Sequence, residues 1–347
     1  MASQIARALA LELLPGETQT LERSGTPTSE AYHAYLKGRF HWNRPGDDGL
    51  EKAIEYYEQA LALDLHFAEA HAALARAKVN WSESSHKPAR VVLEEARRSA
   101  LRALDLDGQI SEAHLALAEV RKRVDWDWAE AERTYRMALA LNPSNEAAHR
   151  SYGVFLAAMG RHGEAIAETE RAVELDPLCL TVNSSAAWAR YAARQYDRVI
   201  TWCRYTLEME PQFVPARRLL AAAYVQTGYV QEAINELEEA MRTAGPEPLL
   251  LAWLAHAQAV DGRRADSLSW LETLGELAER RYVSAYQTAL VHVGLGDFDT
   301  AFAWLEKACT ERASGVVNIG IEPRLDPIRA DARYAALIRR LRLPVLP

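Results

Sequence analysis

Small and bulky apolar residues recur along the chain with a period of 34 residues. Three consecutive segments, 146–179, 180–213 and 214–247, align at this spacing without a gap. The eighth place of each segment holds a small residue, namely Gly153, Ala187 and Ala221. Bulky residues at the seventh and eleventh places share one helix face, and the small residues let a second helix approach closely. Because one such pair cannot bury enough apolar surface alone, the pattern predicts helical hairpins that stack in succession.

Glycine and proline mark the ends of the predicted helices. Four glycines stand where a first helix should end and predict left-handed caps there: Gly160, Gly228, Gly262 and Gly296. Pro177 and Pro211 follow second helices, which they end because proline lacks the amide proton that a helix needs.

We therefore predict an all-α, right-handed α-solenoid of eight hairpins over residues 30–310. An N-terminal helix and linker (1–29) precede it, and a C-terminal loop and capping helix (311–347) follow. The expected hairpins are 30–67, 68–110, 111–145, 146–179, 180–213, 214–247, 248–281 and 282–310. The first helix of 111–145 has one extra residue, and the turns at 43–49 and 82–88 are enlarged.

The repeating positions are similar to those of tetratricopeptide repeats (TPRs), as the unit with Gly296, Phe298, Ala301 and Ala308 illustrates. Two stretches resemble the ends of TPR regions in multidomain bacterial regulators: AYLKGRFHWNRPGDDGLEKAIEYYEQALALD and GLGDFDTAFAWLEKACTER, the latter followed by EPRLDPIRADARYAALIRRL. In those proteins the TPR region follows a winged-helix, Ser/Thr kinase or cyclase domain. The resemblance implies that this chain is the sensory or docking part of a regulator. Either it is a detached version of such a region, or its effector domain, whose motifs this sequence lacks, has been cut away.

The flanking segments have apolar faces of their own. Ile5, Leu9 and Leu13 fall on one side of a short predicted helix, which either leads in from an effector domain or caps the first hairpin. At the other end, residues 326–342 predict a final helix whose Ile328, Tyr334, Leu337 and Leu341 face the last hairpin. Five arginines of this helix should face water: Arg329, Arg333, Arg339, Arg340 and Arg342. The alternative is that these arginines form a basic binding patch.

Charge, cysteine content and apolar stretches bear on the kind of partner and on the location of the protein. The chain carries a net charge of −8, which disfavours direct binding to nucleic-acid phosphates. Cys179, Cys203 and Cys309 lie far apart in the sequence, and their odd number argues against a disulfide framework. This cysteine usage suits a reducing compartment, so we expect a cytoplasmic protein. The most apolar segment, 249–260, is too short for a bilayer span, which needs about 20 residues.

Candidate chemistry is scarce. His71, His114 and His149 share the fourth place of three repeats, one repeat apart, so we expect a packing role rather than a metal site. Asp125 and Asp127 resemble a metal-binding DxD pair, but they stand just before a helix, where Asp is a preferred cap. We predict no catalytic residues, no metal and no cofactor, and hence no enzyme.

The concave face is the remaining candidate site. In a TPR solenoid, the first helix of each hairpin lines that face, and its arginines, amides and aromatics suit peptide ligands. The expected partner-binding residues are Arg39, Trp42, Asn43, Arg76, Asn80, Glu119, Arg123, Arg150, Trp188, Tyr191, Arg218, Gln226 and His256.

We expect a non-catalytic scaffold that binds an extended protein or peptide with acidic or amide character, anchored by an apolar group near Trp188 and Tyr191. The alternatives are the sensory half of a regulator, and a receptor that holds a small molecule in its lumen.

Overall fold

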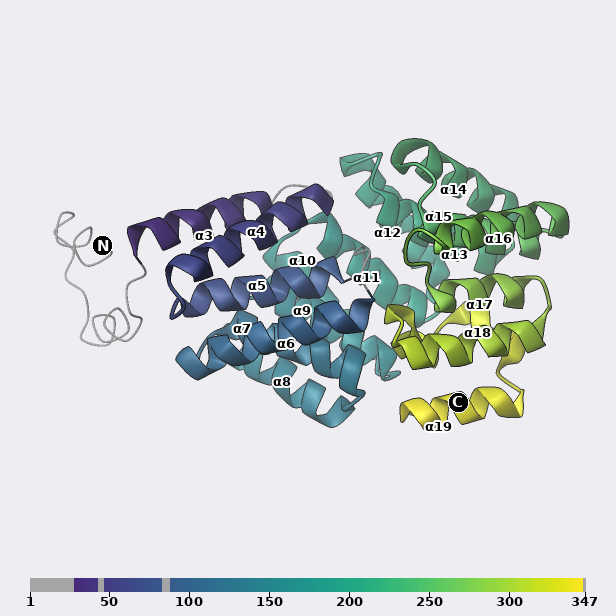
Figure 1. Cartoon of the computed structure of the whole chain (residues 1–347). Helices are drawn as coiled ribbons and strands as arrows, with labels where there is room; N and C mark the ends of the chain where they lie inside the picture. The colour runs from purple at the N-terminus through teal and green to yellow at the C-terminus, as the bar shows by residue number, and fades with distance from the viewer. Residues whose placement is uncertain (1–27, 43–46, 83–87, 346–347) are drawn as a thin grey trace. The chain divides into compact units, whose positions relative to one another are not determined.

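The computed structural model describes residues 28–42, 47–82 and 88–345 (Figure 1). Within these ranges all regular structure is helical and there is no strand, so the predicted all-α solenoid of consecutive hairpins is confirmed. Contacts divide the chain into two compact units. The first comprises Met1–Ser85, Arg90–Arg121 and Arg133–Asn142, and the second comprises His86–Ala89, Lys122–Glu132 and Pro143–Pro347.

The first unit contains the N-terminal hairpins. Its helices are α3 (Ser29–Trp42), α4 (Asp47–Leu63), α5 (Ala68–Trp81), most of α6 (Ala89–Leu106), α7 (Ser111–Val120) and the C-terminal part of α8 (Trp128–Leu141). Gly38 is the small residue at which the two helices of the first hairpin approach closely: a Cβ there would lie 2.5 Å from Cε1 of Tyr57. The enlarged turns predicted at 43–49 and 82–88 fall largely outside the described residues.

The second unit contains five further hairpins and a C-terminal segment. The hairpin helices are α9 (Glu146–Ala158), α10 (His162–Leu175), α11 (Leu180–Ala192), α12 (Tyr196–Met209), α13 (Val214–Thr227), α14 (Val230–Ala244), α15 (Pro248–Val260), α16 (Arg264–Ala278), α17 (Ala285–Gly294) and α18 (Phe298–Glu311). Two 3₁₀ turns, Ser314–Asn318 and Pro323–Ile328, then lead into α19 (Ala332–Leu341). Gly153 again marks a close approach, since a Cβ there would lie 2.6 Å from Cγ2 of Thr169.

The glycines predicted to cap first helices all adopt left-handed backbone conformations: Gly160, Gly228, Gly262 and Gly296, with φ of 72°, 84°, 81° and 73°. In two hairpins a larger residue takes this place, Trp126 with φ 55° and Arg194 with φ 60°. A left-handed conformation costs such a residue about 1–2 kcal/mol, so these two side chains should make contacts that compensate.

The extra residue predicted in the first helix of 111–145 appears as a change of helix type. α7 ends at Val120 and continues as a π-helical turn, Arg121–Asp125. A π-turn holds one more residue than an α-helical turn. The insertion is thereby absorbed before α8 begins, and Trp126 follows directly after it.

The fourth place of the repeat has a structural role. In five successive hairpins its side chain bonds to the backbone carbonyl six residues earlier: His71 to Leu65 (3.1 Å), His114 to Gly108 (3.0 Å), His149 to Pro143 (3.0 Å), Asn183 to Pro177 (2.8 Å) and Arg217 to Pro211 (2.7 Å). These bonds tie each first helix to the loop before it. The regular placement of the three histidines therefore reflects these contacts with the preceding loop.

The C-terminal helix is shorter than predicted, because α19 begins at Ala332 rather than at 326. Ile328, Tyr334, Leu337 and Leu341 are buried as expected. Arg329, however, does not simply face water: its Nη1 donates to the carbonyl of Gly320 (2.8 Å) and to the Tyr334 hydroxyl (2.7 Å).

Candidate partner-binding surface

The first unit brings two of the predicted partner-binding residues into contact. The Arg76 guanidinium on α5 lies over the Trp42 ring at the end of α3, 5.3 Å from its centroid. Both side chains are half-buried, whereas Arg39 on α3 is exposed. Asn80, one helical turn beyond Arg76, is half-buried. The contact between Trp42 and Arg76 therefore links the first two hairpins.

Charges of both signs lie near the Tyr35–Tyr57 pair: burial raises the pKa of Tyr35, Glu69 and Glu112 raise it further, and Arg39 acts in the opposite direction. Burial raises the pKa of Tyr57, and the neighbouring Tyr35 raises it further, while Arg39 and Arg76 act in the opposite direction. An effect of both guanidinium groups on one phenol requires that both lie near it. Tyr57 thus marks the point near which two arginines from different hairpins converge.

Two other predicted residues of the first unit do not join this group. Glu119 is 5% exposed, and its Oε1 accepts a hydrogen bond from the Tyr135 hydroxyl at 2.5 Å. The prediction that Glu119 faces an open groove is therefore wrong, because its side chain turns onto the second helix of its own hairpin. Asn43 lies outside the described residues.

In the second unit the predicted residues occupy two kinds of environment. Arg123, Arg150, Trp188, Arg218 and Gln226 are half-buried. Trp188 and Tyr191 form an aromatic pair with centroids 5.5 Å apart, and Arg218 lies over the Trp253 ring at 5.4 Å. Tyr191 is 0% and His256 4% exposed, so neither lines an open surface.

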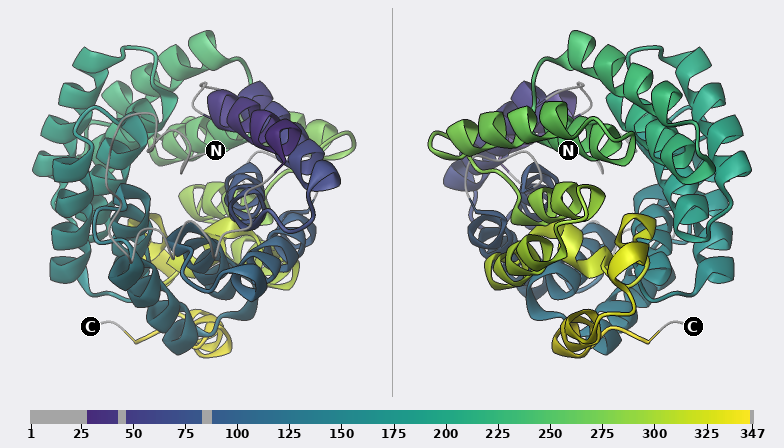
Figure 2. Two further views of the ribbon diagram at one scale, coloured as in Figure 1. Left: turned by 90° about the vertical axis from the view of Figure 1, so that its left-hand side faces the viewer. Right: turned by 90° about the vertical axis from the view of Figure 1, so that its right-hand side faces the viewer.

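The chain's own C-terminal segment, residues 313–331, covers this inner surface. Figure 2 shows it (yellow) on the inner side of the teal and green helices of the second unit. The Tyr191 hydroxyl donates to Oε1 of Glu322 at 3.3 Å. Arg194 donates to both oxygens of Asp326, at 2.6 and 2.7 Å. The sequence predicted an open groove here because the segment that fills it lies more than a hundred residues away.

Arg324 is the most enclosed charge in this segment. Its guanidinium stacks on Trp253, 3.6 Å from the ring centroid, and donates two bonds of 2.9 Å to the Glu322 carboxylate. Burial would raise the pKa of Glu322, but the charge and hydrogen bonds of Arg324 hold it below its usual range. The pair is therefore ionised where it is buried, and each charge depends on the other.

His256 takes part in the same buried region. Its Nδ1 lies 2.7 Å from the carbonyl oxygen of Leu290, to which it donates. Burial lowers the pKa of His256 to about 4, and the positive charge of Arg324 acts in the same direction. The imidazole is therefore neutral at pH 7, which fits a packing role better than contact with an acidic ligand.

Sequence reasoning missed Glu322, Arg324 and Asp326. The signal was present, since these three charged residues alternate with Ile321, Pro323 and Leu325, and the two prolines Pro323 and Pro327 interrupt a regular helix. Ile319, Ile321 and Leu325 are each at most 2% exposed, so the segment is part of the core.

The segment also reaches the start of α8. Trp126 is 7% exposed and packs in a cluster that contains Val316, Leu325 and Leu341. Arg312 lies over the Trp126 ring at 3.3 Å from the centroid. These contacts explain how a tryptophan is kept in a left-handed conformation. Asp127 caps α8 as predicted, accepting a bond from the Glu130 amide at 3.1 Å.

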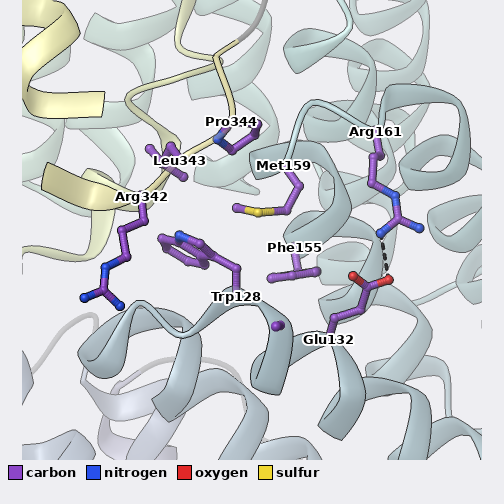
Figure 3. Close-up of a pocket in the computed structure, with 9 residues that line it drawn as sticks. Trp128, Glu132, Phe155, Met159, Arg161, Arg342, Leu343 and Pro344 are labelled. Atoms are coloured by element: carbon purple, nitrogen blue, oxygen red, sulfur yellow. Dashed lines mark hydrogen bonds and ion pairs between the residues drawn. The ribbon is translucent and has the colours of Figure 1, made fainter. Parts of the chain in front are cut away.

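A pocket of about 390 Å³ opens beside this junction (Figure 3). Its floor is apolar, with Trp128, Phe155, Met159, Leu343 and Pro344. The Trp128 indole donates to the carbonyl of Leu341 at 3.0 Å. On one side, Arg161 is paired with Glu132 at 2.7 Å, and Arg342 lies on the other. None of the predicted partner-binding residues lines this pocket.

Metal-binding groups and reactive thiols were the remaining candidates for chemistry in the sequence. In the described part of the chain, no group of three or more His, Cys, Asp or Glu residues is placed to hold a metal ion. Burial raises the pKa of Cys203 to about 12 and that of Cys309 to about 11, which keeps both thiols protonated at neutral pH. Among the described helices, none combines the length and the apolar character needed to cross a membrane.

Comparison with known proteins supports the repeat assignment. Residues 127–178, which cover α8 and the hairpin of α9 and α10, match the tetratricopeptide repeat family. No curated protein matches the sequence.

Solved structures with this fold share little sequence with the chain. A tetratricopeptide repeat protein from Parabacteroides merdae has 13% identity and a TM-score of 0.53, over 78% of this chain and 99% of its own. The monomeric IFIT1 mutant, solved with Gppp-AAAA, has 13% identity and a TM-score of 0.65, over 90% of this chain and 71% of its own. A thermophilic TPR protein from Thermus thermophilus has 18% identity and a TM-score of 0.47, over 56% of this chain and 99% of its own. The similarities to the first two structures concern the fold alone, which is that of TPR-like helical hairpins.

Proposed function

We propose that the chain is a non-catalytic scaffold that binds a protein segment on the inner surface of α3 and α5. TPR proteins generally act as protein-interaction scaffolds, and the repeat assignment favours that class here. The observation that carries the proposal is that Arg76 lies over the Trp42 ring while Arg39, which is exposed, acts with Arg76 on Tyr57.

The chemistry of this surface suggests what its partner should offer. Two arginines that converge near Tyr57 favour a carboxylate, which a guanidinium can hold with two parallel hydrogen bonds. Asn80 can both donate to and accept from a peptide backbone. Trp42 supplies a flat apolar surface, and aromatic and arginine side chains dominate binding energy at interfaces. We therefore propose an extended acidic or amide-rich segment as the ligand.

The second unit offers a weaker site. Tyr191 and His256 are buried beneath the C-terminal segment, which brings Glu322 and Asp326 to the place where we expected a partner. While the segment is bound, the anchor at Trp188 and Tyr191 is not available. For the same reason a small molecule in this lumen is a less favoured function. A regulatory role in a larger protein rests on the sequence resemblance alone.

Peptide selection against the purified full chain tests the proposal. Selected peptides should be enriched in Asp, Glu, Asn or Gln, and their affinity should fall at least about tenfold, or 1.4 kcal/mol, for Trp42→Ala and for Arg76→Ala. Leu101→Ala, an exposed apolar position on α6, is the matched control and should leave affinity unchanged. Peptides that bind both variants as tightly as the unmodified protein would contradict this surface.

A further inference from the structure

The pocket beside the start of α8 combines an apolar interior with charged groups at its edges. Its volume of about 390 Å³ is within the range of pockets that hold small molecules. Trp128 from the start of α8, Phe155 from α9 and Met159 just after α9 lie around its centre (Figure 3). Leu343 and Pro344, which follow α19, complete the apolar lining.

The interior favours a flat aromatic ring. The Trp128 indole is held in a fixed orientation, because its Nε1 donates to the carbonyl of Leu341 at 3.0 Å. Phe155 is fully buried, and Trp128 and Met159 both pack against the core cluster that contains Trp126. Ring faces and edges and the methionine sulfur make favourable contacts with aromatic groups. A ring placed here would need no hydrogen bond from the interior.

The charges at the edges of the pocket are engaged to different degrees. Arg161 donates to Glu132 at 2.7 Å and to the two oxygens of Glu164 at 2.8 and 2.6 Å. The Tyr152 hydroxyl also donates to Glu132, at 3.0 Å. Arg342 is exposed, and within the described residues its side chain pairs with no carboxylate. Arg342 is therefore the lining charge that is available to a ligand, and a guanidinium favours an anion.

We propose that this pocket binds a small aromatic carboxylate, with the ring against Trp128 and Met159 and the carboxylate on Arg342. The site shares no residue with the surface proposed on α3 and α5, so either proposal can fail alone. Its walls come from α8 and α9 on one side and from residues 342–344 on the other. Leu343 belongs to the core cluster that includes the C-terminal segment. A bound ligand would therefore fasten the end of the chain to α8 and α9.

Three probes separate the two parts of the expected ligand. Indole-3-propionate carries the ring and the carboxylate, indole-3-propionamide keeps the ring without the charge, and propionate keeps the charge without the ring. Titration of the full chain, followed through the NMR signals of the probe, should give a Kd of about 1 mM or lower for indole-3-propionate. The amide should bind about fivefold more weakly, which is the upper range for an exposed ion pair. Propionate cannot fill the apolar interior and should show no saturable binding over the same range.

Two substitutions locate the ligand. Arg342→Gln removes the charge at an exposed position, so the acid should bind as weakly as the amide while the affinity for the amide stays unchanged. Met159→Gln keeps the length of the side chain but places a polar group in the interior, and it should weaken the binding of both probes by about fivefold. Arg339→Gln changes an exposed arginine of α19 that does not line the pocket, and this control should leave both affinities unchanged.

Each outcome of the experiment has a definite meaning. If Arg342→Gln and Met159→Gln both leave the affinity for indole-3-propionate unchanged, the acid binds elsewhere and the proposal is overturned. Equal affinities of the unmodified protein for the acid and the amide, or no saturable binding of the acid, would overturn it as well. A peptide that ends in a free tryptophan should bind no more tightly than indole-3-propionate. Much tighter binding of the peptide would assign the pocket to a peptide terminus and would overturn its assignment to a small molecule.

Discussion

The buried imidazole of His256 gives the account a quantitative prediction. In the folded protein its pKa is about 4, below the ordinary value of 6.5 that applies to the unfolded chain. Between these two values the unfolded chain binds more protons than the folded one, so the free energy of unfolding falls as the pH falls. From pH 7 to pH 5 this single group should remove about 2 kcal/mol of stability.

Urea unfolding, followed by circular dichroism at several pH values, measures this loss. Other half-buried histidines contribute as well: burial lowers the pKa values of His71, His162 and His292, whereas the hydrogen bond to Glu168 raises that of His149, so the pH dependence of the unmodified protein sums contributions of both signs. The His256→Gln variant isolates the contribution of His256. It can keep a hydrogen bond to Leu290 and should lose about 2 kcal/mol less than the unmodified protein over the same pH interval.

A matched control guards against a general effect of removing a histidine. His66 is exposed, and His66→Gln should leave the free energy of unfolding at pH 7 unchanged. If His256→Gln has the same pH profile as the unmodified protein, His256 is accessible to water and the C-terminal segment does not enclose it. The reasoning on the second unit would then be refuted.

Three further substitutions test the contacts of the C-terminal segment by urea unfolding. Glu322→Gln should cost about 3–5 kcal/mol because it leaves the Arg324 charge buried without a partner. Replacing both Glu322 and Arg324 by Met should be neutral or stabilising. Equal losses of stability in the single and the double variant would contradict the ion-pair argument. Arg194→Gly should change stability by less than about 0.5 kcal/mol, because two effects offset each other. Glycine relieves the left-handed backbone conformation, and the variant loses the partly exposed ion pair with Asp326. A loss above about 2 kcal/mol would be inconsistent with that balance. Trp126→Gly should lose about 2–4 kcal/mol, because the buried ring is worth more than the strain that glycine relieves; an unchanged midpoint would show that the ring does not hold the segment.

The hairpins could be predicted from the sequence because their determinants are local. A small eighth residue such as Gly153, a glycine cap such as Gly228 and a proline after the second helix lie within one repeat of the contacts that they control. Even the extra residue in 111–145 was visible as a break in register, and it became the π-turn Arg121–Asp125.

Whether the inner surface of the second unit is open or covered could not be predicted in the same way. The 34-residue period determines which helix faces point inward. Whether those faces are exposed to solvent depends on contacts between residues far apart in the sequence, such as Tyr191 and Glu322. The period gives no information on residues 313–331, which do not repeat it. Glu119 was misplaced for a related reason: its position in the repeat suggests a ligand contact, but Tyr135 of the same hairpin takes its carboxylate.

The central claim is that the chain's own C-terminal segment fills the inner surface of the second unit. Hydrogen–deuterium exchange of the full-length protein, read by mass spectrometry over residues 316–329, tests it most directly. The amides of Ile319, Ile321 and Leu325 donate to backbone carbonyls in a buried setting, so they should exchange as slowly as those of α11 and α15. Exchange within seconds, while those helices remain protected, would show that the segment leaves the surface open and would contradict the account.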